Sequence, residues 1–409
     1  MLPLALSAQT FTTLYNFCTQ PYEACAGFTN ITLGPQGELY GIAGGGWWNL
    51  GTVYELLPPA SPGGAWREVV LHSFRGGEVI PQGGLAMGPN GSLYGFAEST
   101  TPGVSMAFRL DPPTSASTDW AYAVISEFTG VADGGPNGAP VFGSPLGYGQ
   151  SLYGVTSAVG ENGAVYRLTP PPVAGGVWTQ EILYAFPSGS SAGASLLGSL
   201  AVGAGGSLFG VTGFGGYVGG ICSDGGGCGM VFSLTPPAVP GGPWTEQVLH
   251  AFDPGIGDGS QPRAGLVLGP GGVLYGTTSE TAEGLSGTVF SLTPPTVAGA
   301  PMTETILHVF NESGRGDGWY PDTPLVLGPN GVLYGTTYYG GDFDCGTVFE
   351  LVPPATPGGD WTETVLHSFN GASDGYGPNG IALAPDGTLY GTTYIGGSRN
   401  GGTLFALTP

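Results

Sequence analysis

The sequence predicts an all-β fold, a seven-bladed β-propeller with four-stranded antiparallel blades. A Leu-Tyr/Phe-Gly tripeptide occurs seven times along the chain, at spacings of 54 to 66 residues. Two further segments, one like Gly-Thr-Val-Phe and one like Val-Leu-His-Ser-Phe, recur with the same period. Turn formers are abundant, with 80 Gly and 37 Pro among 409 residues, which nearly excludes long helices. Repeated β units that cannot bury both faces alone are stable when they stack around a ring.

The three markers define the units. The aromatic residue of the tripeptide is Tyr40, Tyr94, Tyr153, Phe209, Tyr275, Tyr334 and Tyr390. The second marker ends at Tyr54, Phe108, Tyr166, Phe232, Phe290, Phe349 and Phe405. The third marker ends at Phe17, Phe74, Phe128, Phe186, Phe252, Phe310 and Phe369.

The sixth unit illustrates the strands that we expect in each blade. Its β-branched and aromatic segments cover residues 324–327, 332–337, 346–351 and 361–369. A Gly-Pro-Asn-Gly turn, a Gly-rich loop and a Pro/Gly loop separate them, and such residues break helices and tolerate positive φ. Each unit therefore predicts four short antiparallel strands.

The two ends of the chain are complementary. Residues 10–17 form a lone strand of the third-marker kind, whereas the last unit stops after its third strand, residues 403–407. We therefore expect the first strand to complete the seventh blade, which removes two exposed edges and closes the ring. This organisation predicts one propeller domain over residues 10–409. Residues 1–9 (MLPLALSAQ) read as the remnant of a secretory signal or a disordered leader.

Composition and charge bear on the partners. The chain has 29 acidic residues and seven basic residues, all Arg, for a net charge of −22. This charge repels phosphate backbones and anionic lipids, so we expect no nucleic-acid partner. The apolar stretches are too short for a membrane-spanning helix, so no membrane insertion is expected.

The cysteines predict two disulfides. Cys18 and Cys25 are seven residues apart, Cys222 and Cys228 are six apart, and Cys345 is left over. The alternative, a metal site, requires Cys-x-x-Cys or Cys/His spacing that the sequence lacks. Two local disulfides indicate an oxidising compartment, which predicts a secreted protein located outside the cell or at its surface.

The units also resemble a known repeat. The pattern Gly-Pro-x-Gly-x-Leu-Tyr-Gly-Thr-Thr, then Gly-Gly, then Gly-Thr-Val-Phe-x-Leu, as in residues 328–351 and 269–294, resembles the Gloeo_Verruco (GloVer) tandem repeats of bacterial exported proteins. The resemblance covers essentially residues 10–409 and is closest in units five to seven. It implies an exported bacterial protein, and it transfers no established chemistry.

Residues that recur at equivalent positions of several units are interpreted as architecture. The four histidines, the Trp residues that begin outer strands and the acidic residues of an Asp-Gly turn all recur; they are His72, His250, His308, His367, Trp66, Trp120, Trp178, Trp244, Trp361, Asp133, Asp258, Asp317, Asp374 and the turn residue Glu78. We expect the His and Trp side chains to pack or to form hydrogen bonds, and the Asp side chains to accept from their own turns. The alternative for the acidic residues is a ring around the channel that binds Ca²⁺. No metal site or cofactor is otherwise expected.

Residues that vary within the repeated frame are the candidates for ligand binding. The residue after the turn proline, at the expected channel mouth, is Gln82, Asn137, Arg263, Asp322 or Asn379. The loops between second and third strands, expected on the same face, add Trp47, Trp48, Tyr217, Tyr338, Tyr339, Asp342, Tyr394 and Arg399. Aromatic faces interleaved with carboxylates and amides suit sugar rings. The other interpretation of these loops is a solvated surface with incidental aromatic residues.

These observations predict a protein that binds an extracellular polymer, most readily a glycan, and we expect a monomer. The sequence lacks Gly-x-Ser-x-Gly, His-Glu-x-x-His and Gly-Lys-Ser/Thr motifs, and it has no Lys for a Schiff base. The second hypothesis is a glycoside hydrolase with paired channel carboxylates. The third is a structural or appendage protein that self-assembles. Activity on a polysaccharide panel distinguishes the second hypothesis, and filament formation distinguishes the third.

Overall fold

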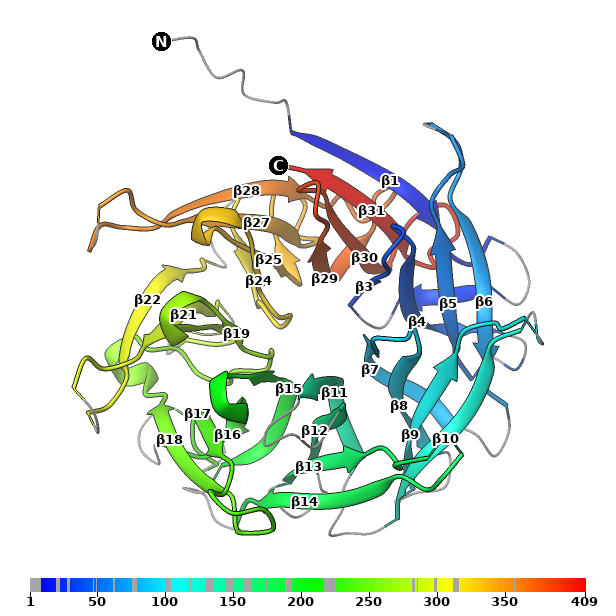
Figure 1. The fold of residues 1–409 in the computed structure, drawn as a ribbon. Coiled ribbons are helices and arrows are strands. Elements are labelled where there is room, and N and C mark those ends of the chain that lie inside the picture. Colours follow the sequence, from blue (N-terminus) through cyan, green and yellow to red (C-terminus); the bar gives the residue numbers. More distant parts are fainter. Residues whose placement is uncertain are drawn as a thin grey trace.

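The computed structural model confirms the predicted fold. It describes residues 9–409 except 20–22, 28–29, 47, 49, 62, 76–78, 100–103, 116, 118, 130–134, 144–149, 158–162, 174, 188–192, 217–221, 223–225, 282–283, 285, 298–299, 312–315 and 357. The strands of this described part form seven antiparallel blades around a central channel (Figure 1). The first eight residues of the expected leader lie outside the described residues.

In each blade the strands run in hydrogen-bonded order from the channel outwards. Blade 1 contains β2 (Ala24–Gly27), β3 (Thr32–Leu33), β4 (Leu39–Gly45), β5 (Thr52–Leu57) and β6 (Arg67–Ser73), and both β2 and β3 pair with β4. Blade 2 contains β7 (Val79–Met87), β8 (Leu93–Ser99), β9 (Ser105–Asp111) and β10 (Ala121–Phe128). Blade 3 contains β11 (Gly135–Gly143), β12 (Ser151–Ser157), β13 (Ala164–Thr169) and β14 (Thr179–Ala185). Blade 4 contains β15 (Ala194–Val202), β16 (Leu208–Phe214), β17 (Met230–Thr235) and β18 (Thr245–Ala251).

The remaining blades complete the ring. Blade 5 contains β19 (Val267–Leu268), β20 (Leu274–Thr278), β21 (Thr288–Thr293) and β22 (Thr303–Val309). Blade 6 contains β24 (Val326–Leu327), β25 (Leu333–Thr337), β27 (Thr347–Val352) and β28 (Thr362–Ser368), with a small extra sheet of β23 (Gly318–Trp319) and β26 (Tyr339–Gly340). Blade 7 contains β29 (Tyr376–Leu383), β30 (Leu389–Ile395), β31 (Thr403–Thr408) and β1 (Thr10–Asn16). Short 3₁₀ turns occur at η2 (Ala204–Gly206), η4 (Pro254–Ile256), η5 (Pro270–Gly272) and η6 (Pro329–Gly331).

The first strand closes the ring, as predicted. Strand β1 pairs antiparallel with β31, from Thr10 opposite Thr408 to Asn16 opposite Thr403. The next residue, Phe17, continues the contact because its amide donates to the Gly402 carbonyl at 3.1 Å. The outer edge of blade 7 is therefore covered by the other end of the chain, which lies beside it in Figure 1.

Close packing explains why glycine recurs at the same position of the Leu-Tyr-Gly tripeptide. A Cβ on Gly335, the glycine of the sixth Leu-Tyr-Gly, would lie 2.5 Å from Cζ of Phe349, the fully buried aromatic residue of the second marker. Gly276 and Phe290 repeat this contact in blade 5 at 2.6 Å. Two of the sequence markers are thus the two halves of one packing contact, because a side chain at the glycine would displace the ring that covers it.

Neighbouring blades touch through the second marker and the outer-strand Trp residues. Gly346 begins the second marker of blade 6 with φ +96°, and a Cβ there would lie 2.5 Å from Pro378 Cδ of blade 7. Trp120 of blade 2 packs at 5.9 Å from Tyr40 of blade 1, ring to ring. The expectation that these Trp residues pack is confirmed, and their partner is the tripeptide aromatic residue of the preceding blade.

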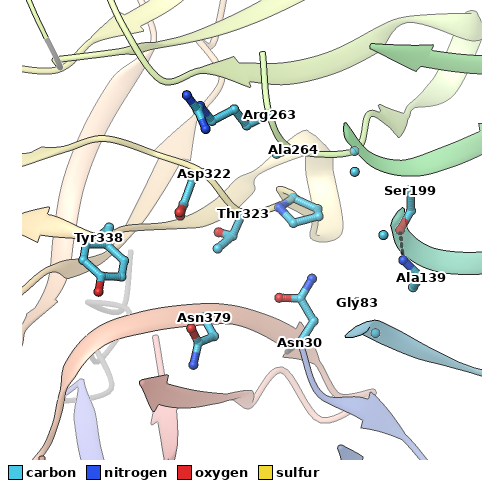
Figure 2. A pocket seen from close by; sticks show the side chains of 15 residues that line it. Asn30, Gly83, Ala139, Ser199, Arg263, Ala264, Asp322, Thr323, Tyr338 and Asn379 are labelled. Atoms are coloured by element: carbon cyan, nitrogen blue, oxygen red, sulfur yellow. Dashed lines mark hydrogen bonds between the residues drawn. The ribbon is translucent and has the colours of Figure 1, made fainter. Parts of the chain in front are cut away.

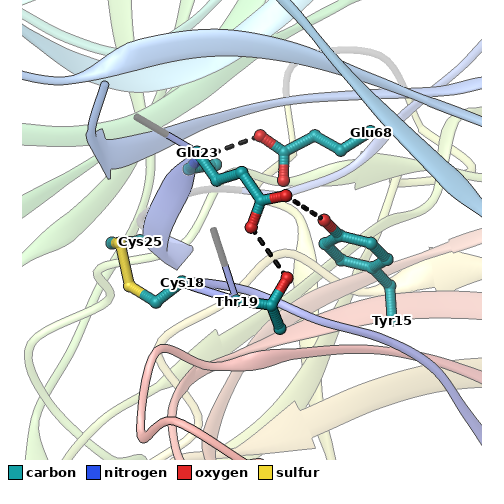
Figure 3. The surroundings of a disulfide bond; sticks show 7 residues. Tyr15, Cys18, Thr19, Glu23, Cys25 and Glu68 are labelled. Atoms are coloured by element: carbon teal, nitrogen blue, oxygen red, sulfur yellow. Dashed lines mark hydrogen bonds between the residues drawn. A yellow bond between two sulfur atoms is a disulfide. The ribbon is translucent and has the colours of Figure 1, made fainter. Parts of the chain in front are cut away.

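Both predicted disulfides are present. The Cα atoms of Cys18 and Cys25 are 4.9 Å apart, and those of Cys222 and Cys228 are 5.4 Å apart, within the usual range. Cys18 follows β1 of blade 7, and Cys25 lies in β2 of blade 1 (Figure 3). This first disulfide therefore joins the last blade to the first across the closure. In the described part of the chain, no helical segment has the length and apolar character that crossing a bilayer requires.

Candidate ligand-binding site at the channel mouth

The inner strands carry bulges that bring backbone into the channel. The pairing register shifts between Gln82 and Ala86 of β7, between Asn137 and Val141 of β11, and between Leu197 and Ala201 of β15. Residues left out of a ladder at such a bulge project away from the sheet. In β7 and β11 the shift begins at the residue after the turn proline, which is why the sequence frame located these two segments.

Residues of all seven blades, including these bulged segments, line one cavity of about 230 Å³. Blades 2 to 4 contribute small residues, Gly83, Gly84, Gly138, Ala139, Gly198 and Ser199. The polar and aromatic side chains come from blades 5, 6, 7 and 1, namely Arg263, Asp322, Thr323, Tyr338, Asn379 and Asn30 (Figure 2). The cavity is therefore asymmetric, with a small-residue wall facing a polar wall.

The small-residue wall is small because adjacent backbones meet there. Gly138 has φ +69°, and a Cβ on it would lie 2.5 Å from the Gly198 carbonyl oxygen of the next blade. Gly198 itself has φ +69°. Any side chain at these positions would meet both a strained backbone and a fixed neighbour.

Charge on the polar wall is concentrated at Arg263 and Asp322. The Arg263 guanidinium donates to Gln261 Oε1 at 2.6 Å and lies 5.9 Å from the ring centre of Tyr320. Burial raises the pKa of Asp322 to about 6, and the attraction of Arg263 offsets part of that rise. A carboxyl group with this pKa titrates just below neutral pH, so its charge is sensitive to a ligand that desolvates it further.

An aromatic cluster adjoins the polar wall, and it consists of Trp319, Tyr320, Tyr338, Tyr339 and Tyr376. Trp319 stacks on Tyr339 with ring centres 4.3 Å apart. Tyr338 lies 4.6 Å from Tyr339 and 5.6 Å from Tyr376, both edge to face. Tyr320 has φ +61°, a conformation that costs a bulky residue about 1 kcal/mol or more. Such strain is maintained by surrounding contacts and is frequent at binding sites.

The structure brings several predicted site residues together. Arg263, Asp322, Tyr338 and Asn379 line the same cavity, and Tyr339 contacts Tyr338. The two predicted loop sets therefore share one face, since Tyr338 follows a second strand and the other three follow outer strands. Asn137 lies beside the cavity, where its Oδ1 accepts from the Gly138 amide at 2.8 Å.

Other predicted residues lie elsewhere. Trp48 is 60% exposed and lies with His72 and Arg75 against the outer strand β6, away from the cavity. Asp342 and Arg399 are exposed in loops of blades 6 and 7, Tyr394 is exposed near the end of β30, and none of the three is among the residues that line the cavity. Trp47, Tyr217 and the side chain of Gln82 lie outside the described residues.

Sequence reasoning missed five residues of this site, namely Asn30, Thr323, Trp319, Tyr320 and Tyr376. Asn30 precedes the marker residue Tyr40 by ten positions, much as Asn379 precedes Tyr390 by eleven, so alignment on that marker would have found it. Tyr320 directly precedes the turn proline Pro321, so the same alignment would have identified it. For Trp319 and Tyr376 the sequence carries no signal beyond their closeness to these turns.

The acidic residues of the Asp-Gly turns do not surround the channel. Asp258 accepts from the Asp253 amide at 3.0 Å and lies 3.0 Å from Nε2 of the outer-strand residue His250. Asp374 repeats this contact with His367 at 3.0 Å. The expectation that these Asp side chains satisfy their own turns is confirmed. The described members lie beside outer-strand histidines rather than around the channel, and Asp133 and Glu78 lie outside the described residues.

Solved structures of similar fold were found across most of the chain. They include a putative oxidoreductase (glucose dehydrogenase) from Thermus thermophilus, with 18% identity, 98% of this chain and 99% of that chain covered, and a TM-score of 0.44. A Penicillium chrysogenum α-L-arabinanase complexed with arabinobiose has 14% identity, coverage of 83% and 96%, and a TM-score of 0.47. The Cps50 (Swd1) β-propeller domain of Myceliophthora thermophila has 10% identity, coverage of 97% and 99%, and a TM-score of 0.49. Similarity at this level concerns the fold alone.

No match was found among curated proteins. The sequence profile of one family, described as the Gloeobacter/Verrucomicrobia repeat, matches residues 216–409. This stretch holds part of blade 4, blades 5 and 6, and the three inner strands of blade 7, where the repeat is most regular. This match supports the resemblance to the Gloeobacter/Verrucomicrobia repeat that the motifs of residues 269–294 and 328–351 indicated.

Proposed function

We propose that the chain binds a glycan at the channel mouth, through the polar wall of blades 5, 6, 7 and 1 and the aromatic cluster beside it. One observation carries the proposal: five aromatic rings in mutual contact adjoin a cavity lined by Arg263, Asp322 and two Asn side chains. Sugar rings present C–H faces that stack on Tyr and Trp, and hydroxyls that bond to carboxylates, amides and guanidinium groups.

The size of the cavity restricts the ligand. Its volume of about 230 Å³ lies below the ~300–1,000 Å³ of pockets that enclose drug-sized molecules. We infer that the cavity takes one sugar unit while the neighbouring units extend along the aromatic cluster. A location outside the cytoplasm, supported by the two disulfides, is part of the proposal.

The proposal is for binding rather than hydrolysis. Hydrolysis of a glycosidic bond uses two carboxyl groups on either side of the bond. Among the described residues that line the cavity, Asp322 alone has a carboxyl group. Release of reducing sugar from the bound glycan, lost in Asp322→Asn, would favour the hydrolase instead.

A glycan array followed by titration calorimetry tests the proposal. The Tyr338→Ala variant should bind the selected glycan about 5- to 150-fold more weakly, equivalent to ~1–3 kcal/mol for one stacking ring at a binding hot spot. Trp48→Ala is the matched control, because it removes an exposed aromatic side chain that lies away from the cavity. Wild-type binding by Tyr338→Ala together with loss in Trp48→Ala would refute the location.

A further inference from the structure

One repeated position joins the outer strands of neighbouring blades at all seven interfaces. A His, Tyr or Ser near the end of one outer strand meets the second residue of the next outer strand. The pairs are Tyr15 with Glu68, His72 with Tyr122, Ser126 with Gln180, Tyr184 with Glu246, His250 with Glu304, His308 with Glu363, and His367 with Phe11.

At two of these interfaces the pair is extended to a trio of metal-ligand side chains. Between blades 4 and 5, His250 Nε2 lies 3.0 Å from Asp258 Oδ2 and 3.6 Å from Glu304 Oε1. Between blades 5 and 6, the corresponding residues are His308, Asp317 and Glu363. In each cluster one ligand atom from each residue lies within 4.8 Å of the other two.

The first cluster contains buried ligand atoms that lack a hydrogen-bond partner. The Asp258 side chain is only 2% exposed, and its Oδ1 is buried without a hydrogen bond. Glu304 Oε1 is also buried without one. An unpaired buried oxygen is costly, and a bound cation would relieve that cost at both carboxyl groups.

The second cluster repeats this deficiency. His308 Nε2 and Glu363 Oε1 are both buried without a hydrogen bond, and Asp317 Oδ2 lies 3.5 Å from that nitrogen. One imidazole and two carboxylates neutralise a dication and supply the nitrogen and oxygen donors that Zn²⁺ accepts. Three protein ligands leave a fourth tetrahedral position for water.

We propose that each cluster, His250/Asp258/Glu304 and His308/Asp317/Glu363, is a binding site for a divalent transition-metal ion such as Zn²⁺. Each ion would hold an outer strand, the turn after it and the outer strand of the following blade. The ions would therefore stabilise the contacts between blades 4, 5 and 6, independently of any ligand at the channel mouth.

The next interface along the chain is a natural control. His367 lies 3.0 Å from Asp374, as in the first cluster, but Phe11 occupies the place of the glutamate and stacks on the imidazole at 3.6 Å. This interface has the His and the Asp without the third ligand. The proposal predicts that it binds no ion.

Calorimetric titration of the full chain with ZnCl₂ tests the proposal. All variants carry Cys345→Ser, because Cys345 is the cysteine outside the two disulfides and a thiolate also binds zinc. We expect two ions per chain, one after Glu304→Gln or Glu363→Gln, none after both, and two still after His367→Ala. Glutamine keeps the shape of glutamate, and a melting curve of each apo variant verifies that it folds.

Each outcome decides the matter for the cluster concerned. A glutamine substitution that leaves stoichiometry and affinity within about threefold of wild type refutes that cluster, since loss of a ligand should cost more than the ~10-fold typical of a supporting residue. Binding that survives the double variant, or absence of Zn²⁺ binding to the parent protein, refutes both. Zinc should also raise the melting temperature of the parent protein and leave that of the double variant unchanged.

Discussion

The closure of the ring can be tested with one substitution at Phe17. This side chain follows β1, is fully buried, and packs at 5.2 Å and 58° against Tyr54, a fully buried residue of blade 1. Phe17→Ala removes a large side chain from the junction between the last blade and the first. Fully buried Phe→Ala substitutions cost about 3–5 kcal/mol of unfolding free energy, a large share of the ~5–15 kcal/mol that keeps a protein folded.

The repeat supplies a control that has no closing role. Phe310 occupies the same position after β22, is 2% exposed, and packs at 5.2 Å and 66° against Phe349 of the next blade. Its blade is continuous along the chain, so only the local packing is lost in Phe310→Ala. If β1 is as firmly held as an internal outer strand, the two variants should be destabilised equally, within about 1 kcal/mol.

Equilibrium unfolding in urea, followed by tryptophan fluorescence, measures both variants. A cost below about 1 kcal/mol for Phe17→Ala beside a full cost for Phe310→Ala would mean that β1 detaches without affecting the ring. That result would refute the closure as a stabilising device. A second, earlier transition in Phe17→Ala alone would have the same meaning, because it would show blade 7 unfolding separately.

Three further changes have defined outcomes. Trp244→Ala should cost about 3–5 kcal/mol of unfolding free energy and leave glycan affinity unchanged, because this outer-strand side chain is only 8% exposed. Tyr338→Ala should weaken glycan binding and leave stability unchanged, as measured by the same melt and titration. Burial raises the pKa of Glu68 from the ordinary 4.5 to about 7, so ionising it opposes folding; unfolding free energy should fall by up to about 3 kcal/mol between pH 4.5 and 7 relative to Glu68→Gln, and equal pH profiles would contradict this assignment. Replacing Cys18 and Cys25 by Ser should lower stability by about 2 kcal/mol through loss of the short cross-link, and identical urea midpoints with and without it would reject that role.

The fold was predictable because its determinants are local and repeated. The glycine of Leu-Tyr-Gly and the aromatic residue of the second marker recur together because one covers the other, as Gly335 and Phe349 show. Selection for the same packing seven times leaves a periodic signal in a single sequence. Closure was predictable for a similar reason, because the missing strand of the last unit matches the extra strand at the start.

The site was only partly predictable, because variability shows which positions are released from packing but does not show where they lie. Arg263, Asp322 and Asn379 follow the turn proline, so the frame located them. Trp48 is equally unrepeated, yet its loop places it against the outer strand β6. The asymmetry of the cavity depends on inner-strand bulges that bring the glycines of blades 2 to 4 into contact, and a bulge is not specified by the alternation of side chains.

The clusters between the outer strands show a limit of reasoning from repeats. The histidines recur in four units, and that recurrence predicts packing or hydrogen bonding rather than a metal site. Each of the four histidines, however, faces a residue of the next blade that does vary, namely Tyr122, Glu304, Glu363 or Phe11. Chemistry can therefore reside where a repeated residue meets a variable one across an interface. A search for such sites has to compare each repeated residue with the residue that it contacts in the next unit. Comparing only equivalent positions assigns the histidine to packing and never considers its partner.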